Sequence, residues 1–157
     1  MRAAVLTVSD GVVAGTREDL SGDLLSERLA GAGFDVADRR TVPDERDAIE
    51  AALRELAGTA ALVLTTGGTG FAPRDVTPEA TAQVVERPTP GLDEHMRAVS
   101  IAASPHGMLS RGRSGIAGSS LIVNFPGSPR ACAELFDAVA PALDHGLRLL
   151  LDLPTAH

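Results

Sequence analysis

The sequence predicts a three-layer α/β fold, in which helices cover both faces of a mostly parallel sheet. Strand-like and helix-like patterns alternate along the whole chain. Residues 60–65 are apolar at positions that face both sides of a sheet, which is typical of a central parallel strand. Small or polar residues follow three predicted strands, at 9–11, 65–70 and 126–128. In a parallel sheet these junctions lie along one edge, where ligands bind.

The N-terminal segment is typical of a strand, a helix and a second strand. Residues 3–8 form the first strand and end at the turn sequence 9–11. Ser21 is placed to cap a helix over residues 22–30, whose leucines fall on one face. Residues 34–41 alternate weakly between apolar and polar side chains, which predicts a short strand at the edge of the sheet.

The middle of the chain repeats the alternation. A second helix is predicted from Pro43-Asp44 to Ala57, because its apolar side chains recur at helical spacing. The strand at 60–65 then runs directly into a glycine-rich loop. Thr77-Pro78 and Thr89-Pro90 each combine a capping hydroxyl with a proline in the first turn, and each predicts the start of a helix.

The C-terminal part contains one ambiguous segment and one long helix. Residues 110–120 are rich in Gly and Ser, so they form either a loop or a hairpin that leads to a strand at 121–125. A final helix is predicted after Ser128-Pro129, and Pro141 inside it should cause a kink or a restart. The chain contains no internal repeat or linker, so we expect one domain over residues 1–157.

Composition excludes several functional classes. The net charge is −7, all 14 basic residues are Arg, and the chain contains neither Trp nor Tyr. Such a chain lacks the basic surface and the stacking side chains that nucleic-acid binding requires. No apolar run approaches the ~20 residues that span a bilayer. The N-terminus has no signal-peptide pattern, so we expect a cytoplasmic protein.

The single cysteine and the histidines show no metal or disulfide pattern. Cys132 has no partner for an internal disulfide and lies in an alanine-rich stretch, so we interpret it as a small buried helix residue. The four histidines are scattered, and no spacing is typical of a zinc site.

The loop at 65–70 is the strongest local indication of function. Three glycines in four residues allow a backbone to approach a ligand and to point its N–H groups at phosphate oxygens. The loop is not a Walker A motif, since the chain has no Lys. It is not the dinucleotide fingerprint either, since Pro73 stands where the third glycine belongs. The alternative is a tight strand-to-helix turn without a ligand.

Three aspartates are candidates for the chemistry at this edge. Asp10 follows the first strand, Asp44 follows the second, and Asp75 follows the glycine loop. Asp44 is also well placed to be a helix N-cap, and Asp75 to form a turn with its own backbone. The functional hypothesis is that Asp44, Asp75 or both hold Mg²⁺ against phosphate oxygens.

Three arginines and one aromatic residue are nearest to the predicted edge. Arg74, Arg111 and Arg113 could each hold a phosphate with two hydrogen bonds, although each could equally serve solubility. Phe71 follows the loop directly, and it either stacks on a flat ring or anchors the loop to the core.

The segment 65–80 closely resembles the central motif of the Mog/MoaB family of molybdenum-cofactor biosynthesis proteins, which is similar to the N-terminal domain of gephyrin. The resemblance runs in order from about Ala3 to Leu151. Shorter matching stretches are residues 7–10, 19–22, 42–45, 90–92, 109–111 and 124–129.

The resemblance implies one molybdopterin-binding domain that assembles as a homotrimer or a hexamer. It implies binding of molybdopterin, a pterin that carries a terminal phosphate, and in the enzymatic members AMP transfer from Mg-ATP to that phosphate. The two key aspartates of the family fall on Asp44 and Asp75. Where members often carry a basic residue, Ser119 is neutral and Arg130 keeps the charge.

We therefore expect a molybdopterin adenylyltransferase, in which Asp44 and Asp75 are catalytic and hold Mg²⁺. A non-catalytic molybdopterin-binding or carrier protein of the MoaB type is the alternative, and a structural oligomer like the gephyrin scaffold is a weaker one. Expected partners are molybdopterin and ATP, with other cofactor-biosynthesis proteins possible, but neither nucleic acid nor membrane. The expected ligand-binding residues are Ser9, Asp10, Thr66, Gly67, Gly68, Thr69, Gly70, Arg74, Ser110, Arg111, Pro126, Gly127 and Ser128.

Overall fold

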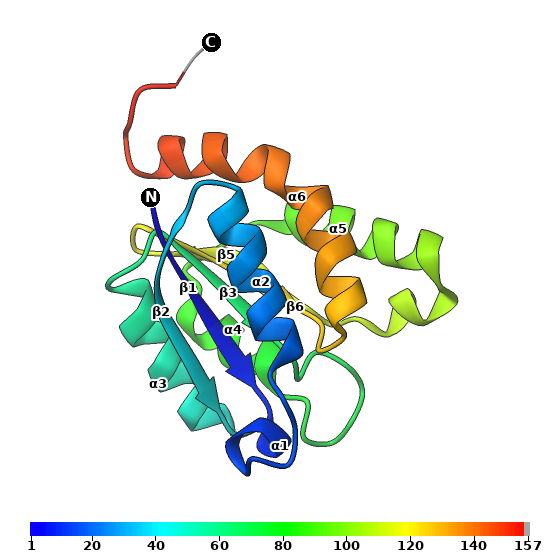
Figure 1. Ribbon diagram of the computed structural model, residues 1–157. Helices are drawn as coiled ribbons and strands as arrows, with labels where there is room; N and C mark the ends of the chain where they lie inside the picture. Colours follow the sequence, from blue (N-terminus) through cyan, green and yellow to red (C-terminus); the bar gives the residue numbers. More distant parts are fainter. Residues whose placement is uncertain (156–157) are drawn as a thin grey trace.

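The computed structural model describes residues 1–155 and shows one six-stranded sheet between two layers of helices (Figure 1). The strand order is β2-β1-β3-β6-β5-β4, and the first four of these strands are parallel. β5 and β4 complete the sheet in antiparallel orientation. The strands are β1 (Arg2–Val8), β2 (Asp35–Val42), β3 (Leu62–Thr66), β4 (Arg87–Pro88), β5 (Ser114–Ala117) and β6 (Ser120–Phe125).

The helices divide between the two faces of the sheet as a three-layer fold requires (Figure 1). One face carries α2, α5 and α6, and the other carries α3 and α4. The short helix α1 and the 3₁₀ helix η1 lie outside these layers. The helices are α1 (Asp10–Val13), α2 (Leu20–Gly31), α3 (Arg46–Ala57), α4 (Thr77–Val84), α5 (Pro90–Ala103), η1 (Pro105–Leu109) and α6 (Pro129–Leu150).

The predicted fold class and the central strand are confirmed. All five residues of β3 are buried, because β1 and β6 flank this strand and helices cover both of its faces. Leu62 and Leu64 pack toward α2 and α6, whereas Val63 packs toward α3 and α4. This alternation makes the strand apolar throughout, since neither face meets water.

The edge strand and the ambiguous segment are also settled. β2 lies at one edge of the sheet, as predicted, and its side chains alternate between exposed and half-buried. Residues 114–125 form a β-hairpin rather than a loop, and Gly118 supplies the left-handed turn residue with φ of +58°.

The start of α2 differs from the prediction, because Asp19 rather than Ser21 caps this helix. The Asp19 carboxylate accepts a hydrogen bond from the Gly22 amide at 3.0 Å and another from the Thr7 hydroxyl at 2.8 Å. Ser21 therefore lies inside the first turn. Asp and Ser are equally good caps, and the contact with Thr7 on β1 decides between them.

Two other predicted boundaries are wrong. Asp44 does not cap α3, which begins at Arg46 after Glu45, and Asp44 bonds to residue Asp10 instead. The turn after β1 is a short helix, α1, whose cap is Ser9, since its Oγ accepts from the Val12 amide at 3.2 Å. Both segments lie at the carboxyl edge of the sheet.

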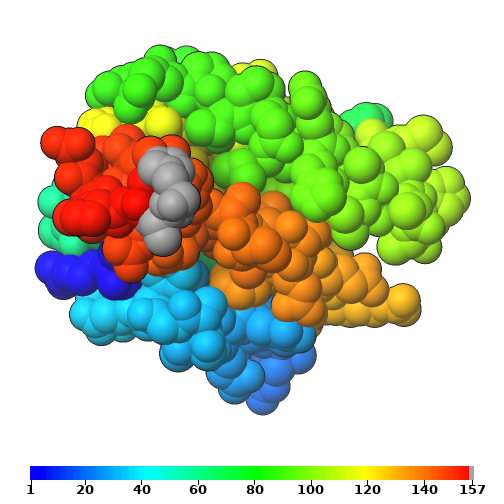
Figure 2. Space-filling view, turned by 90° about the horizontal axis from the view of Figure 1, so that it is seen from above, coloured from blue at the N-terminus to red at the C-terminus, as the bar shows by residue number. Residues whose placement is uncertain are grey.

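The last helix continues through its proline. α6 is unbroken from Pro129 to Leu150, so Pro141 does not restart it, and Figure 1 shows the helix changing direction along its length. Seen from above, α6 lies beside the green segment of α5 and η1 (Figure 2). Within residues 1–155 no helix is long and apolar enough to cross a membrane.

Candidate functional site

The glycine loop adopts a conformation that strongly favours glycine. Gly67 and Gly68 have φ of +95° and +66°. A Cβ on Gly67 would lie 2.3 Å from the carbonyl oxygen of Val8, and a Cβ on Gly68 would lie 2.4 Å from the Thr77 hydroxyl oxygen. The backbone of the loop is therefore pressed against both β1 and the start of α4.

Thr77 holds this loop instead of capping its own helix. Its hydroxyl donates to the Gly67 carbonyl at 2.9 Å, and its amide donates to the Gly68 carbonyl at 3.1 Å. The side chain makes no capping hydrogen bond to α4. The prediction of a helix start at Thr77-Pro78 is confirmed, but the predicted use of the hydroxyl is wrong.

Asp10 and Asp44 bind each other's backbones at the ends of β1 and β2. The Asp10 amide donates to Asp44 Oδ2 at 2.9 Å, and the Asp44 amide donates to Asp10 Oδ1 at 3.0 Å. Arg74 also donates to both oxygens of Asp10, at 2.6 and 3.0 Å, and this guanidinium holds the pKa of that carboxyl below its usual value. Asp10 is therefore ionised, and both of its oxygens accept hydrogen bonds from the protein.

Asp44 keeps one oxygen available. Its Oδ1 accepts no hydrogen bond from the described part of the chain, and it lies 3.2 Å from the position of a Cβ on Gly68. The side chain thus faces the glycine loop across a short gap.

Asp75 also has one occupied and one available oxygen. Its Oδ2 accepts from the Ala72 amide at 3.1 Å, which is the local turn that the sequence suggested, and this oxygen lies 2.9 Å from the position of a Cβ on Gly70. Within residues 1–155 nothing donates to Asp75 Oδ1. The local turn and an exposed carboxylate oxygen therefore coexist.

Two pockets meet at the glycine loop. The α1–α2 pocket, about 510 Å³, lies between the end of β1, the segment 16–21 and the loop. The α5–α6 pocket, about 590 Å³, lies between the loop, η1 and the start of α6. Gly68, Asp75 and Gly127 line both pockets. The loop with Asp75 is therefore the wall that separates two adjoining cavities.

Most of the predicted site residues line one of these two pockets. The α1–α2 pocket is lined by Ser9, Asp44, Thr66 and Gly67, besides the three shared residues. The α5–α6 pocket is lined by Thr69, Gly70, Ser110, Pro126 and Ser128. Asp10 and Arg74 pair with each other instead of lining either pocket, and Arg111 lies outside both.

Arg111 turns toward the protein. Its Nε donates to the Gly70 carbonyl at 2.7 Å, its Nη2 donates to the Asp75 carbonyl at 2.6 Å, and its Nη1 pairs with Glu79. Burial acts to raise the pKa of Glu79, but the hydrogen bonds from Arg111 and the backbone, together with the nearby arginine charges, lower this pKa below its usual value. The guanidinium that was predicted to hold phosphate thus holds protein oxygens.

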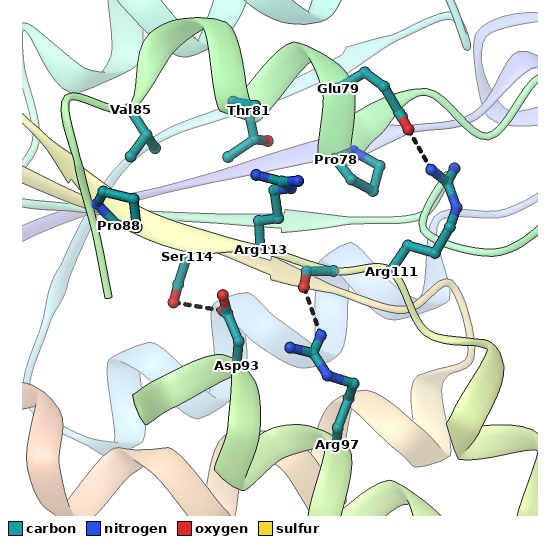
Figure 3. Close-up of a pocket in the computed structure, with 12 residues that line it drawn as sticks. Pro78, Glu79, Thr81, Val85, Pro88, Asp93, Arg97, Arg111, Arg113 and Ser114 are labelled. Atoms are coloured by element: carbon teal, nitrogen blue, oxygen red, sulfur yellow. Dashed lines mark hydrogen bonds and ion pairs between the residues drawn. The ribbon is translucent and has the colours of Figure 1, made fainter. Parts of the chain in front are cut away.

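Arg113 lies in a third pocket, of about 450 Å³, between α4 and α5 (Figure 3). Figure 3 shows its guanidinium reaching toward Thr81 and Pro78, and no described residue forms a hydrogen bond or ion pair with that guanidinium. Across the pocket, burial raises the pKa of Asp93, although this carboxylate accepts from the Ser114 hydroxyl at 2.6 Å.

Two further side chains resolve open alternatives. Phe71 is 67% exposed, so it does not anchor the loop to the core. Cys132 is buried in α6, as predicted, where its thiol donates to the Pro126 carbonyl at 3.0 Å. Burial raises the pKa of this thiol to about 11.

Ser119 lies away from the candidate site. It sits in the β5–β6 turn, before the start of β6, whereas Pro126 and the glycine loop follow the opposite ends of β6 and β3. The neutral residue at this position therefore has no bearing on ligands at the carboxyl edge. Arg130, by contrast, lines the α5–α6 pocket.

Sequence reasoning missed several residues that line the pockets. Asp19 and Arg17 line the α1–α2 pocket, and His106 and Glu134 line the α5–α6 pocket. The matching stretch 19–22 was a signal for Asp19. Arg17, His106 and Glu134 carry no local pattern, because only the folded chain brings their segments to the pockets.

The metal-binding potential of the site rests on its carboxylates. In the part of the chain that the structure describes, no group of three or more His, Cys, Asp or Glu side chains is arranged to hold a metal ion. Asp44 and Asp75 both line the α1–α2 pocket. A cation held by these two side chains would take its remaining ligands from phosphate oxygens and water, as Mg²⁺ commonly does.

A parallel α/β sheet with a glycine loop, two available carboxylates and two adjoining pockets at its carboxyl edge is typical of proteins that bind phosphate-bearing ligands. The model of the probable molybdopterin binding domain family matches residues 4–145. The chain belongs to this family, and its resemblance to the Mog/MoaB proteins of molybdenum-cofactor biosynthesis is confirmed.

Known relatives match most of the chain. It is 42% identical to the molybdopterin adenylyltransferase of Helicobacter pylori strain J99, over 94% of this chain and 86% of that protein. It is 43% identical to the molybdenum cofactor synthesis protein cinnamon of Drosophila melanogaster, but it spans only 25% of that longer protein. The structure of the molybdopterin biosynthesis enzyme MoaB from Thermus thermophilus matches with a TM-score of 0.91 and 46% identity, over 98% of each chain.

Proposed function

We propose that this chain is a molybdopterin adenylyltransferase, which transfers AMP from ATP to the terminal phosphate of molybdopterin and releases pyrophosphate. The observation that carries the proposal is the pair of pockets that share Gly68, Asp75 and Gly127. A reaction between two phosphate-bearing substrates needs both phosphates at one place. Relatives named molybdopterin adenylyltransferase at 40–42% identity support this assignment.

The chemistry requires positioning and charge neutralisation more than proton transfer. An oxygen of the molybdopterin phosphate attacks the α-phosphorus of ATP, and the bond between that phosphorus and the bridging oxygen of pyrophosphate breaks. The attacking phosphate is already ionised near neutral pH, so the chain needs no strong general base. The glycine loop would place its amides against phosphate oxygens at the shared wall.

Asp44 and Asp75 fit a magnesium ion. Each carboxylate offers one oxygen that the described residues leave without a hydrogen bond, and both side chains line the same pocket. We propose that these two oxygens hold Mg²⁺ together with phosphate oxygens of ATP. Bound there, Mg²⁺ would neutralise charge on the transferred group and on the leaving pyrophosphate.

Each pocket contains one arginine among a larger number of acidic side chains, so phosphate binding also needs Mg²⁺ and backbone N–H groups. Arg17 lines the α1–α2 pocket and Arg130 lines the α5–α6 pocket. The first turn of α6, at Ser128–Arg130, also faces the α5–α6 pocket, and the N-terminus of a 22-residue helix favours anions.

The test is direct detection of the product. We would incubate the protein with molybdopterin and Mg-ATP and measure adenylylated molybdopterin by mass spectrometry and pyrophosphate in the same samples. We expect both products in equal amounts, and we expect Asp75→Asn to abolish them while molybdopterin still binds. Binding of molybdopterin without any ATP-dependent product would favour the non-catalytic carrier of the MoaB type.

We also propose that residues 1–157 act as one molybdopterin-binding domain in a cytoplasmic homotrimer or hexamer. The family resemblance supports this assembly, since the match extends over residues 4–145. Light scattering of the purified chain at several concentrations measures the mass directly. A mass of one chain at every concentration would contradict the assembly.

A further inference from the structure

The segment 71–75, between the glycine loop and Asp75, makes few hydrogen bonds within itself. Residues 71–74 are all exposed. Within the segment, the Asp75 amide donates to the Ala72 carbonyl at 2.9 Å and the Ala72 amide donates back to Asp75 Oδ2. Beyond these bonds the pair of Arg74 with Asp10 holds the outer side, and that pair is exposed. An external contact must therefore fix the distance between Asp75 and the loop.

Arg111 makes that contact. Its Nε and Nη2 donate to the carbonyls of Gly70 and Asp75, which are the two ends of the exposed segment. A guanidinium presents these donors in one rigid plane, so it fixes both carbonyls at once. An ammonium group donates from a single point and cannot reproduce this geometry.

The base of Arg111 is itself rigid. Its amide donates to the Thr69 carbonyl at 2.9 Å. Two residues further on, Arg113 exchanges hydrogen bonds with Asn124 of β6, at 3.1 and 2.9 Å. Arg97 of α5 also holds the Gly112 carbonyl at 3.0 Å. The guanidinium therefore connects the loop to the sheet and to α5.

The ion pair between Arg111 and Glu79 fixes the direction of the guanidinium through the nitrogen that the two carbonyls do not use (Figure 3). Glu79 lies in the first turn of α4, which follows the exposed segment. Arg111 lines neither of the two pockets that meet at the loop, so it lies behind the wall that carries Asp75. Its contacts place it against the backbone of the site rather than against a ligand.

We propose that Arg111 is a positioning residue, which holds Asp75 and the end of the glycine loop in the geometry that AMP transfer requires. This role rests on the proposed adenylyltransferase function. In this role Arg111 binds backbone carbonyls of the site, whereas the sequence alone had suggested that it binds a phosphate. The rate of transfer, and not the affinity for substrates, should depend on it.

The kinetic test compares Arg111→Lys and Arg111→Met with the wild type. A misplacement of about 1 Å costs on the order of 10²-fold in rate, so we expect kcat to fall by about that factor in Arg111→Met. Arg111→Lys keeps the pair with Glu79 but loses the double contact, and its kcat should fall less. The KM values for ATP and molybdopterin should stay within about threefold of wild type in both variants. A raised KM with unchanged kcat would show that Arg111 binds a substrate and would overturn the proposal.

The structural test needs no activity. Amide hydrogen exchange over residues 69–76 should accelerate in Arg111→Met and, to a lesser degree, in Arg111→Lys. The matched control is Arg148→Met, since Arg148 pairs with Asp144 near the C-terminal end of α6 and lines none of these pockets. It should leave exchange and kcat unchanged.

These two readouts separate the possible failures. If the wild type forms no adenylylated product, the proposed function fails, and the exchange data still decide whether Arg111 orders the loop. Unchanged exchange in both Arg111 variants would overturn the positioning role even in an active enzyme. Should Arg111→Met fail to fold, Arg111→Lys carries the same comparison, with thermal unfolding as the check that it is folded.

Discussion

At the scale of single residues, the glycines of the loop were predictable and the arginines were not. Gly67 and Gly68 have a distinctive sequence pattern, because few backbones other than tight loops need several adjacent glycines. Arg111 has no such pattern. An arginine that holds phosphate and one that holds carbonyl oxygens use the same donors, so only the fold distinguishes them.

Substitution of Gly67 measures how tightly the loop is packed. Gly67→Ala combines a left-handed φ with a Cβ placed 2.3 Å from the Val8 carbonyl oxygen, so it should lower the free energy of unfolding by at least about 2 kcal/mol. Gly15→Ala is the control, because Gly15 has φ of +72° but nothing within 4 Å of its Cβ position. We expect a loss of about 1 kcal/mol or less there. Equal losses in urea titrations would show that the loop has room to move.

The thiol of Cys132 should not react with alkylating reagents in the native protein. Burial raises the pKa of its thiol to about 11, so the reactive thiolate is scarce at pH 8. We expect no labelling by iodoacetamide in native buffer and complete labelling in guanidinium chloride, measured by mass spectrometry. Rapid labelling of the native protein would contradict the buried position of this side chain.

At the scale of elements, the sequence predicted the order of helices and strands better than their ends. The ends depend on contacts between elements. Asp19 caps α2 and also accepts a hydrogen bond from Thr7 on β1. Asp44 does not cap α3, because its carboxylate binds the amide of Asp10, which follows β1. The contact of Asp19 with Thr7 and that of Asp44 with Asp10 each join residues that are distant in the sequence, so no local pattern indicates them.

The cap of α2 can be tested by a matched pair of substitutions. Asp19→Ala removes the bond to the Gly22 amide and the partner of the Thr7 hydroxyl, so it should cost about 1 kcal/mol or more of unfolding free energy. Ser21 lies two residues further on, and no described residue forms a hydrogen bond with its side chain, so Ser21→Ala should change stability by less than about 0.5 kcal/mol. Denaturant unfolding of both variants measures the difference. A larger loss in Ser21→Ala would restore Ser21 as the cap.

The pair of Asp10 with Arg74 predicts a pH dependence. Arg74 lowers the pKa of Asp10 in the folded state below the usual value of 3.8. The stabilisation from this pair is therefore fully present above that value and is lost as the pH falls through the folded pKa. We expect the difference in unfolding free energy between wild type and Arg74→Ala to shrink from pH 7 to pH 3. A constant difference would mean that Arg74 contributes through packing alone.

At the scale of the whole molecule, the sequence predicted the three layers and the edge of the sheet that carries the site. It could not predict that this edge contains two pockets instead of one. The second pocket depends on η1 and the first turn of α6 closing over Gly70. Gly127 and Pro129, at the start of α6, also line the α1–α2 pocket, so the same segment contributes to both pockets. No local sequence pattern indicates this arrangement.

The central claim is that two phosphate-bearing substrates meet at Gly68 and Asp75. The most direct measurement is a crystal structure of the wild-type protein with molybdopterin, Mn²⁺ and an ATP analogue whose α,β-bridge is a methylene group and cannot be cleaved. We predict that the two ligands occupy separate pockets, with their phosphates adjoining at the glycine loop and Mn²⁺ bound by Asp44 and Asp75. Both ligands competing for one pocket, or Mn²⁺ bound away from both aspartates, would contradict the claim.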